Sequence, residues 1–172
     1  QHFDVLHANP AAPEPQDVPV ALRHLFMLEQ QLAHTDKIIQ IFARGRGQLM
    51  QLFEATAAAM QLSDTDFSAQ VWLTTVINSN SPRTLDKPMA QGLIDFARHG
   101  QMSIITPFCL AGAMAPVTLE GALALQHAEA LAGIVLAQMT KSGAPISYGG
   151  FSSNVDMKSG APAFGTPEHI KL

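Results

Sequence analysis

Four short apolar runs, separated by longer segments with helical patterning, constrain the fold of this chain more than any other feature. The runs occupy residues 37–43, 71–77, 102–106 and 145–148. Successive runs begin roughly 30 to 45 residues apart, which is the spacing of repeated strand–helix units. The runs are continuously apolar rather than alternating, as is typical of strands buried on both faces of a parallel sheet. The sequence therefore predicts an α/β fold built on a parallel sheet.

The segments between these runs predict helices. Apolar residues recur at helical spacing, or dominate throughout, in four stretches: 18–34, 49–61, 89–97 and 119–142. Thr118 is a suitable N-cap for the last helix, and Gly100 is well placed to end the third. Asp64 and Asp66 indicate a turn after the second helix. The predicted order is strand and helix in strict alternation.

Two architectures accommodate this order: an open doubly wound sheet, or part of a (β/α)8 barrel. A complete barrel has eight strands and typically about 250 residues, whereas these 172 residues supply about four βα units. The chain also stops at Leu172, where a further crossover helix is expected to start. We therefore predict a partial (β/α)8 TIM-type barrel over residues 18–172. Residues 1–17 hold three prolines and little periodicity, which indicates an arm or linker.

The chain carries few charges for its size. Charged residues make up 14% of the sequence, against about 25% in a typical domain. We expect more protein to cover part of the surface, either other copies in a homo-oligomer or the remainder of a larger fold. The net charge of −4 and the lack of a Lys/Arg cluster argue against nucleic acid and anionic membranes as partners.

The most apolar stretch, residues 119–140, predicts a buried helix of a soluble protein. Gln126, His127 and Glu129 lie at its middle, where they would be costly inside a membrane. Cys109 is the single cysteine, so no internal disulfide is possible, and a small buried thiol is the expected role. No basic and then apolar leader begins the sequence. These features predict a cytoplasmic protein.

Residues 148–168 form the most unusual segment. They hold four glycines and two prolines, follow a predicted strand and show neither helical nor strand periodicity. A tyrosine, two phenylalanines and a methionine in the same segment argue against disorder. Two interpretations remain: an ordered loop that forms one wall of a site, which we favour, or a Gly/Pro-rich surface excursion.

Several motifs in this sequence resemble those of the trimethylamine methyltransferase family. They cover roughly residues 34–168, and the loop at 148–168 is the most specific of them. The others are Asn78-Ser79-Asn80-Ser81-Pro82, Ile105-Thr106-Pro107-Phe108, residues 110–119 and residues 131–138.

The resemblance implies a (β/α)8 barrel enzyme that removes a methyl group from a tertiary or quaternary methylated amine. In that family the methyl group passes to the cobalt of a corrinoid (cobalamin) carried by a separate protein, so no cofactor binds the enzyme directly. Some members carry pyrrolysine, and relatives without it use substrates such as glycine betaine. The corresponding position, and with it the catalytic residue, is expected beyond Leu172.

Loops at the carboxyl ends of parallel strands supply the candidate substrate-binding residues. A quaternary ammonium is best held over aromatic faces, at about 0.5–2 kcal/mol per contact. Tyr148, Phe108, Phe151 and Phe164 are the candidates, with Tyr148 favoured; core packing is the alternative for each phenylalanine.

Polar and small residues of the same loops complete the predicted site. Asn78 and Asn80 either orient a carboxylate or amine, or form a turn. Asp156 either offsets substrate charge or is a solvated loop carboxylate, and Gly149 either lets the backbone turn or lets it approach a ligand closely. No metal site is predicted, because the seven histidines and Cys109 show no ligand spacing.

Two other functions remain open. One is a barrel enzyme of aldolase or lyase type, which would need a Schiff-base lysine within a strand. Lys87, Lys141 and Lys158 fall in loops or at helix ends, and Lys37 only begins a strand. The other is a non-catalytic fragment that oligomerises through open sheet edges.

Overall fold

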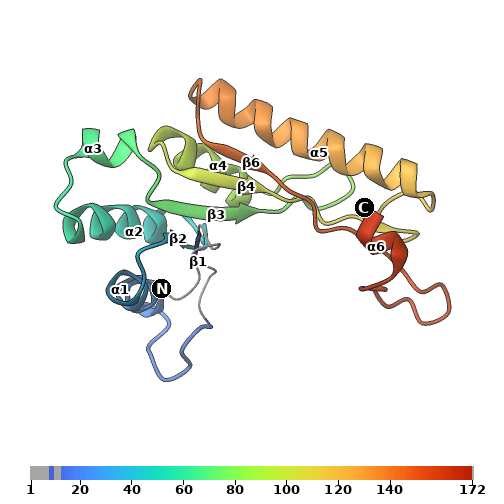
Figure 1. Ribbon diagram of the computed structural model, residues 1–172, viewed down its shortest axis with the longest axis horizontal. Coiled ribbons are helices and arrows are strands. Elements are labelled where there is room, and N and C mark those ends of the chain that lie inside the picture. The colour runs from blue at the N-terminus through green and yellow to red at the C-terminus, as the bar shows by residue number, and fades with distance from the viewer. Residues whose placement is uncertain (1–7, 10–12, 172) are drawn as a thin grey trace.

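The computed structural model describes residues 8–9 and 13–171 and contains a five-stranded parallel sheet (Figure 1). The sheet order is β1-β2-β3-β4-β6, the same as the order along the chain. All five strands are parallel, and the four predicted strands are confirmed. Their bounds are β1 Ala8–Asn9, β2 Ile38–Gln40, β3 Leu73–Ile77, β4 Met102–Ile105 and β6 Ile146–Tyr148.

Each predicted helix is present, with the expected caps where these were specified. Thr118 Oγ1 accepts a hydrogen bond from the Gly121 amide at 3.2 Å, and Gly100 ends a helix with a φ of +70°. That left-handed conformation favours glycine, and a Cβ here would also lie 2.3 Å from the Ser68 carbonyl oxygen. The helices are α1 Arg23–His34, α2 Arg46–Ala59, α3 Asp64–Ala69, α4 Lys87–Arg98, α5 Leu119–Thr140 and α6 Pro167–Lys171.

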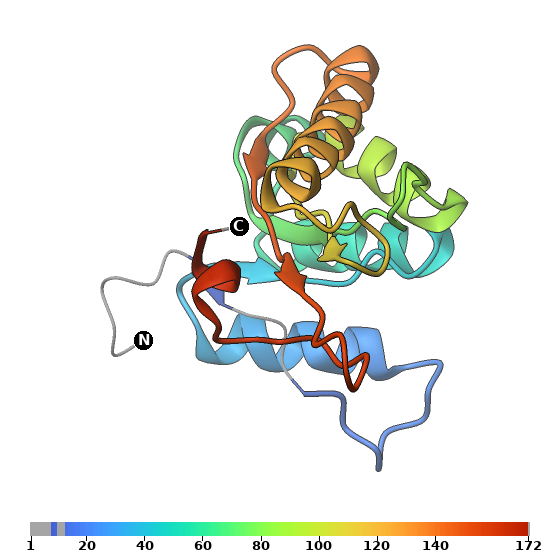
Figure 2. The same cartoon turned by 90° about the vertical axis from the view of Figure 1, so that its right-hand side faces the viewer.

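The helices follow the strands in an arc. Figure 2 shows α1, α2, α4 and α5 in chain order around one side of the strands. Both α4 and α5 pack closely on the same face of the sheet. A Cβ added at Gly92 of α4 would lie 2.6 Å from Ala43 Cβ, and one added at Gly133 of α5 would lie 3.0 Å from Ile105 Cδ1. Small residues at these positions therefore let the helices rest directly on the strands.

The α/β class with a parallel sheet is confirmed, and the sheet is open within the described residues. Its strand order contains no reversal, whereas a doubly wound sheet reverses direction at a switch point. The main core lies between the sheet and the helices, where the rings of Phe53 and Phe96 meet edge to face at 5.2 Å. Closure into an eight-stranded barrel stays a prediction.

Three sequence expectations need correction at the level of elements. Within the predicted arm, Ala8–Asn9 forms β1 and pairs with β2, while residues 1–7 and 10–12 of the arm lie outside the described residues. The predicted turn at Asp64 and Asp66 is the short helix α3, because the Ser63 hydroxyl accepts from the Asp66 amide as an N-cap.

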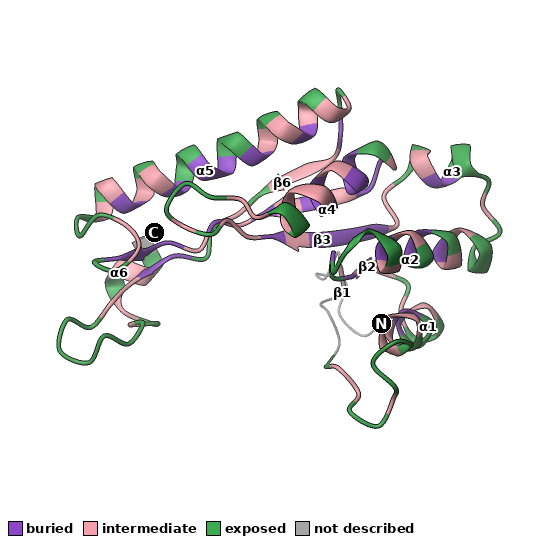
Figure 3. Cartoon of the chain, turned by 180° about the vertical axis from the view of Figure 1, so that it is seen from behind, coloured by how far each residue is buried: buried purple, intermediate pink, exposed green. Residues whose placement is uncertain are grey.

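The helix α5 is buried along one face only, which corrects the expectation of a buried helix. Only a third of its most apolar 18-residue window is buried, although the window has a mean hydropathy of 1.2. By length and composition alone such a helix could cross a membrane, yet here its buried residues face the sheet and include Gln126 and Glu129. The alternation of buried and exposed residues along α5 is visible in Figure 3.

Candidate functional site

The strands β4 and β6 continue past the sheet as a two-stranded parallel ribbon. Backbone amides of 149, 151, 153 and 155 donate to the carbonyls of 105, 107, 109 and 111 at 2.9–3.2 Å. The far end of this ribbon contains the short strands β5 Leu110–Ala111 and β7 Ser153–Asn154. The segment 148–168 is therefore ordered, and its first third is held in strand register that its composition did not reveal.

An aromatic cluster lies on the ribbon face opposite α5. The rings of Phe108 and Phe151 stack at 5.5 Å between centroids, and the Phe164 ring lies 5.5 Å from that of Phe151. His169 of α6 meets the Phe164 ring edge-on at 5.4 Å. Phe151 and Phe164 are each 51% exposed, so these rings are not core residues of the described chain. We call Phe108, Phe151, Phe164 and His169 the aromatic cluster.

His169 is the member of the cluster that the sequence did not predict. Its Nδ1 lies 2.7 Å from the Ser152 carbonyl, which can only accept, so Nδ1 carries a proton and the ring orientation is fixed. His169 belongs to α6, which follows the loop at 148–168. It lies beside Phe164 because the chain folds back between the two residues. Its position two residues after the Pro167 that starts α6 was the available signal.

Tyr148 lies on the other face of the ribbon, which separates it from the phenylalanines with which it was grouped. Its ring is 5.8 Å from that of His127 on α5, and its hydroxyl is 3.4 Å from His127 Nδ1. Successive side chains of a strand point to opposite faces, so Tyr148 and Phe151, three residues apart, diverge. The structure brings together three of the four predicted aromatic residues.

Gly149 lies on the same face of the ribbon as the aromatic cluster, and the neighbouring strand leaves no room for a side chain there. A Cβ at this position would lie 2.6 Å from Thr106 Cγ2 on the neighbouring strand. That distance is shorter than any tolerable contact, so the ribbon closes only with glycine here. The close neighbour of Gly149 in the structure is therefore Thr106, and close approach of a ligand to this backbone stays a prediction.

Two of the three predicted polar residues, Asn80 and Asp156, are engaged in local hydrogen bonds of their own loops. The backbone N–H of Asn80 donates to the Thr84 carbonyl at 2.7 Å, and the Asn80 side-chain oxygen accepts from the backbone N–H of Asp86. Asp156 accepts from the Ser159 hydroxyl at 2.6 Å, and that bond, with a second from the Lys158 amide, lowers its pKa. Asn78 is half-buried immediately after β3. For Asn80 the turn-forming alternative describes its contacts in the structure, and Asp156 is an exposed loop carboxylate that also caps its own turn.

A buried carboxylate on α5 accepts several hydrogen bonds from the loop that follows β3. Glu129 is 8% exposed, and its Oε2 accepts from the hydroxyls of Ser79 and Ser81, the latter at 2.6 Å. Its Oε1 accepts from the Arg83 amide at 2.6 Å. The Cys109 thiol lies 3.8 Å from Oε2. One side chain therefore connects α5, the β3–α4 loop and the ribbon.

The sequence pattern did not reveal the role of Glu129, which appears there only as a polar residue in the middle of an apolar helix. Two features of the sequence could have indicated this contact. One is the single carboxylate in the otherwise uncharged stretch 121–140, and the other is the pair of serines in the motif at 78–82, which are separated by one residue. Beside Glu129 lies a cavity of about 340 Å³ whose other walls are mainly apolar, including Ile77, Leu85 and Leu136.

The Cys109 thiol is fully buried, as expected. Burial raises its pKa above the ordinary value of 9.0, and the Glu129 carboxylate acts in the same direction, while hydrogen bonding from Ser81 and Ser152 opposes them. Because the thiolate is the reactive form, this environment suppresses its reactivity.

We expect Cys109 to resist alkylation by iodoacetamide at pH 8 in the native protein and to react fully in urea. The rate for its peptide, followed by mass spectrometry, should fall at least about 100-fold on folding. Because the folded pKa is raised, its contribution to stability is complete below about pH 8.5–9 and is lost as the pH rises through the folded pKa. Fast native-state alkylation at pH 8 would contradict this assignment.

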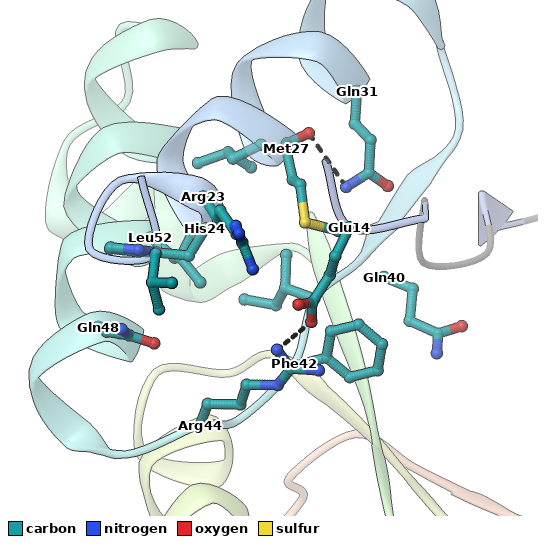
Figure 4. Close-up of a pocket in the computed structure, with 13 residues that line it drawn as sticks. Glu14, Arg23, His24, Met27, Gln31, Gln40, Phe42, Arg44, Gln48 and Leu52 are labelled. Atoms are coloured by element: carbon teal, nitrogen blue, oxygen red, sulfur yellow. Dashed lines mark hydrogen bonds and ion pairs between the residues drawn. The ribbon is translucent and has the colours of Figure 1, made fainter. Parts of the chain in front are cut away.

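A second, smaller cavity of about 130 Å³ lies where the chain leaves β2 (Figure 4). Arg44 forms an ion pair with Glu14 there, and its guanidinium carbon is 4.6 Å from the centre of the Phe42 ring. His24 and Gln48 also line this cavity. The ion pair connects the segment before α1 to the chain that follows β2. We therefore interpret this cavity as part of that structural connection.

Comparisons with known proteins identify the family of this chain. A sequence model of the trimethylamine methyltransferase family matches residues 1–172. The glycine betaine methyltransferase of Desulfitobacterium hafniense (strain Y51) is 39% identical over 155 residues, which are 90% of this chain and 32% of that protein. The trimethylamine methyltransferase MttB of Methanosarcina barkeri (strain Fusaro / DSM 804) is 39% identical over 88 residues, 51% of this chain and 18% of that protein.

A further relative, MttB of Desulfitobacterium hafniense (strain DSM 10664 / DCB-2), is 27% identical over 154 residues, 90% of this chain and 31% of its own length. The chain thus spans about a third or less of the length of these relatives. Because the family model matches the chain from end to end, this protein belongs to the trimethylamine methyltransferase family.

Proposed function

We propose that the complete protein transfers a methyl group from a tertiary or quaternary methylated amine to the cobalt of a corrinoid held by a separate protein. Membership of a methyltransferase family supports the reaction class. The observation that carries the substrate class is the aromatic cluster, where two half-exposed rings flank the end of a parallel ribbon. Methylated ammonium groups are recognised over such faces because they offer few or no hydrogen-bond donors.

The chain's own residues would position the substrate and exclude water from it. For a quaternary amine, the bond between carbon and nitrogen would break with its electron pair left on nitrogen, and the methyl carbon would bond to the acceptor's cobalt, whose reduced Co(I) form supplies the electron pair of the new bond. The departing tertiary amine is neutral and needs no proton. Rate enhancement would then come from alignment of donor and acceptor. This chemistry needs no acid–base pair in the aromatic cluster.

We further propose that this segment is an arc of a (β/α)8 barrel. The supporting observations are the unreversed strand order and the arc of helices in Figure 2. The aromatic cluster lies past the carboxyl ends of β4 and β6, where such barrels place their active sites. The part of the relatives that the chain does not cover is long enough to supply the remaining strands and the opposite wall.

The arrangement of lysines does not favour an aldolase-type enzyme. Within residues 13–170, no lysine lies inside a strand. Lys37 precedes β2 and faces Asp36 at 3.7 Å, Lys87 starts α4, and Lys158 is exposed in the turn closed by Asp156. A Schiff-base mechanism would therefore have to use a lysine outside these residues.

Replacing Phe151 by alanine is expected to weaken substrate binding. Phe151 is the central ring of the aromatic cluster. The change therefore removes one cation–π face and also the ring contacts of Phe108 and Phe164. Loss of about 0.5–2 kcal/mol raises the KM for the methylated amine by about 2- to 30-fold. The control is Phe26→Ala, which removes a 40% exposed ring from α1 and should leave KM unchanged. An unchanged KM in Phe151→Ala would contradict the proposed role.

The function itself is tested by incubating the complete protein with a corrinoid protein reduced to Co(I). Glycine betaine, trimethylamine and choline are supplied separately, and loss of the Co(I) absorbance is followed together with the demethylated amine. We expect one of these amines, or a close homologue, to be demethylated in equal amount to the cobalt methylated. Failure with every tertiary and quaternary amine tested would reject the proposal.

A further inference from the structure

The His169 side chain is fixed in place by hydrogen bonds that lie entirely within the described residues. Its Nδ1 donates to the Ser152 carbonyl at 2.7 Å, and Ser152 is itself buried, with its hydroxyl accepting from the Cys109 amide at 3.1 Å. The Thr166 hydroxyl, just before α6, lies 3.0 Å from Asn154 Oδ1 and connects the start of that helix to the ribbon. The ribbon therefore sets both the position and the orientation of the imidazole ring.

The other ring nitrogen of His169 is free to meet a ligand. Among the described residues no group hydrogen-bonds to Nε2, and this atom is not buried. Because the proton of the neutral ring lies on Nδ1, Nε2 presents a lone pair. No carboxylate of the described part of the chain forms an ion pair with this histidine. A second proton on the ring would therefore add a positive charge that none of these side chains neutralises.

His169 shares its neighbours with the proposed amine site. Its ring centroid lies 5.4 Å from that of Phe164 and 6.3 Å from that of Phe151, at interplanar angles of 76° and 85°. These are the two half-exposed rings of the aromatic cluster. A substrate cation held against them and an imidazolium at position 169 would interact with the same two rings and repel each other.

We propose that His169 contacts the bound methylated ammonium and must be neutral for it to bind. This inference rests on the proposed function of the aromatic cluster. In the neutral ring, the Nε2 lone pair attracts the methyl groups, over which the positive charge of the ammonium is spread. In the protonated ring, Nε2 carries a hydrogen with positive charge, and the attraction becomes repulsion. The affinity for a methylated ammonium therefore falls as the pH is lowered.

The other ionisable residues around His169 come from the turn before the loop's end and from α6. They are Asp156, Lys158, Glu168 and Lys171, whereas segments 149–155 and 159–166 contain no ionisable side chain. Asp156 is exposed, and hydrogen bonds from Ser159 and Lys158 lower its pKa. Carboxyl and ammonium groups ordinarily titrate outside the range of about pH 5.5–8, and histidine titrates within it. A change in affinity inside this range therefore reports on a histidine.

The test is the binding of tetramethylammonium, whose charge does not depend on pH, to the complete protein. Ligand-observed NMR measures its Kd without any corrinoid protein. For the parent protein we expect the Kd to rise about 10-fold between pH 8 and pH 5.5. His169→Phe keeps an aromatic ring that cannot gain a proton, so its Kd should change by less than about 2-fold. The control His127→Phe, on the other face of the ribbon, should retain the parent's pH dependence.

A second variant and a second ligand separate this charge effect from a loss of structure. His169→Gln carries no charge, and its amide can still donate to the Ser152 carbonyl, so it should also bind tetramethylammonium equally at both pH values. Circular dichroism of each sample shows whether the fold is kept at pH 5.5. The uncharged tert-butyl analogue of choline should bind the parent protein with the same Kd at both pH values, because it carries no charge to be repelled.

The outcomes distinguish this inference from the proposed function. Binding by the parent that does not change with pH, or a pH dependence that persists in both His169 variants, would overturn the role of His169 and leave the proposed function in place. A parent protein that binds neither tetramethylammonium nor glycine betaine at pH 8 would overturn both. Tighter binding of glycine betaine at pH 5.5 would show that protonated His169 holds the substrate carboxylate, and would reject the requirement for a neutral ring.

Discussion

Replacing Glu129 by alanine is expected to lower the free energy of unfolding by about 3–5 kcal/mol, because it removes the acceptor of a buried network. The hydroxyls of Ser79 and Ser81 and the Arg83 amide all donate to this carboxylate. Without it they are left without that acceptor beside a largely apolar cavity. Chemical denaturation in urea measures the loss. Hydrogen exchange should show faster exchange confined at first to residues 79–85.

Two variants control this prediction. Glu129→Gln keeps the shape and one acceptor oxygen, so its loss is expected to be smaller, about 1–3 kcal/mol, since at least one donor then faces an amide NH2 group. Glu120→Gln removes a carboxylate from an exposed position on the same helix and should change stability by less than about 1 kcal/mol. If Glu129→Ala were as stable as Glu120→Gln, the carboxylate would not be what holds the loop.

The Glu129 variants also separate structure from substrate binding. Glu129 lies on the ribbon side that faces α5, whereas the aromatic cluster lies on the other side. We therefore expect Glu129→Gln to lower stability without the KM increase predicted for Phe151→Ala. A KM that rises in both variants would show that the two sides of the ribbon act together.

Replacing Gln101 by leucine is expected to cost on the order of 4 kcal/mol in the free energy of unfolding. This residue follows α4 and precedes β4 in the sequence, and its fully buried side chain bonds five backbone groups at once. Its Oε1 accepts from the amides of Trp72 and Leu73 at 2.9 and 3.0 Å. Its Nε2 donates to the carbonyls of Phe67, Gln70 and His99 at 2.8–3.1 Å. Leucine fills a similar volume and satisfies none of them.

A second substitution makes the cause of that loss clear. Gln101→Glu retains the oxygen that accepts from β3 but places another oxygen against three carbonyl groups, so it should be at least as damaging as leucine at neutral pH. Gln30→Leu, an identical change at an exposed position of α1, is the control and should shift stability by less than about 0.5 kcal/mol. A mild effect of Gln101→Glu would mean that the amide donor contributes little.

The order of elements was predictable because it depends on local pattern. The apolar runs at 71–77 and 102–106 became β3 and β4, and the caps at Thr118 and Gly100 appear as expected. Strand propensity and helix capping are set by neighbouring residues in the sequence, so they survive without knowledge of the fold. The strands β5 and β7 were missed because each is only two residues long, too short to show a period.

The candidate site was predicted as a set of loops but not as an arrangement of side chains. Phe108, Phe151 and Phe164 do come together, yet Tyr148 is turned to the opposite face by the strand register of the ribbon. That register depends on which amides of one strand find which carbonyls of the other, and no feature of residues 148–155 alone fixes it.

The sequence by itself determined the parallel α/β class, the order of its longer strands and helices, and the family to which the chain belongs. Only the tertiary structure decided that Glu129 fastens the β3–α4 loop, that His169 joins the aromatic cluster, and that α5 leaves one apolar side uncovered. The division has a physical reason. Helices, strands and caps arise from residues a few positions apart, whereas a buried hydrogen-bond network and an uncovered helix face depend on contacts between residues tens of positions apart.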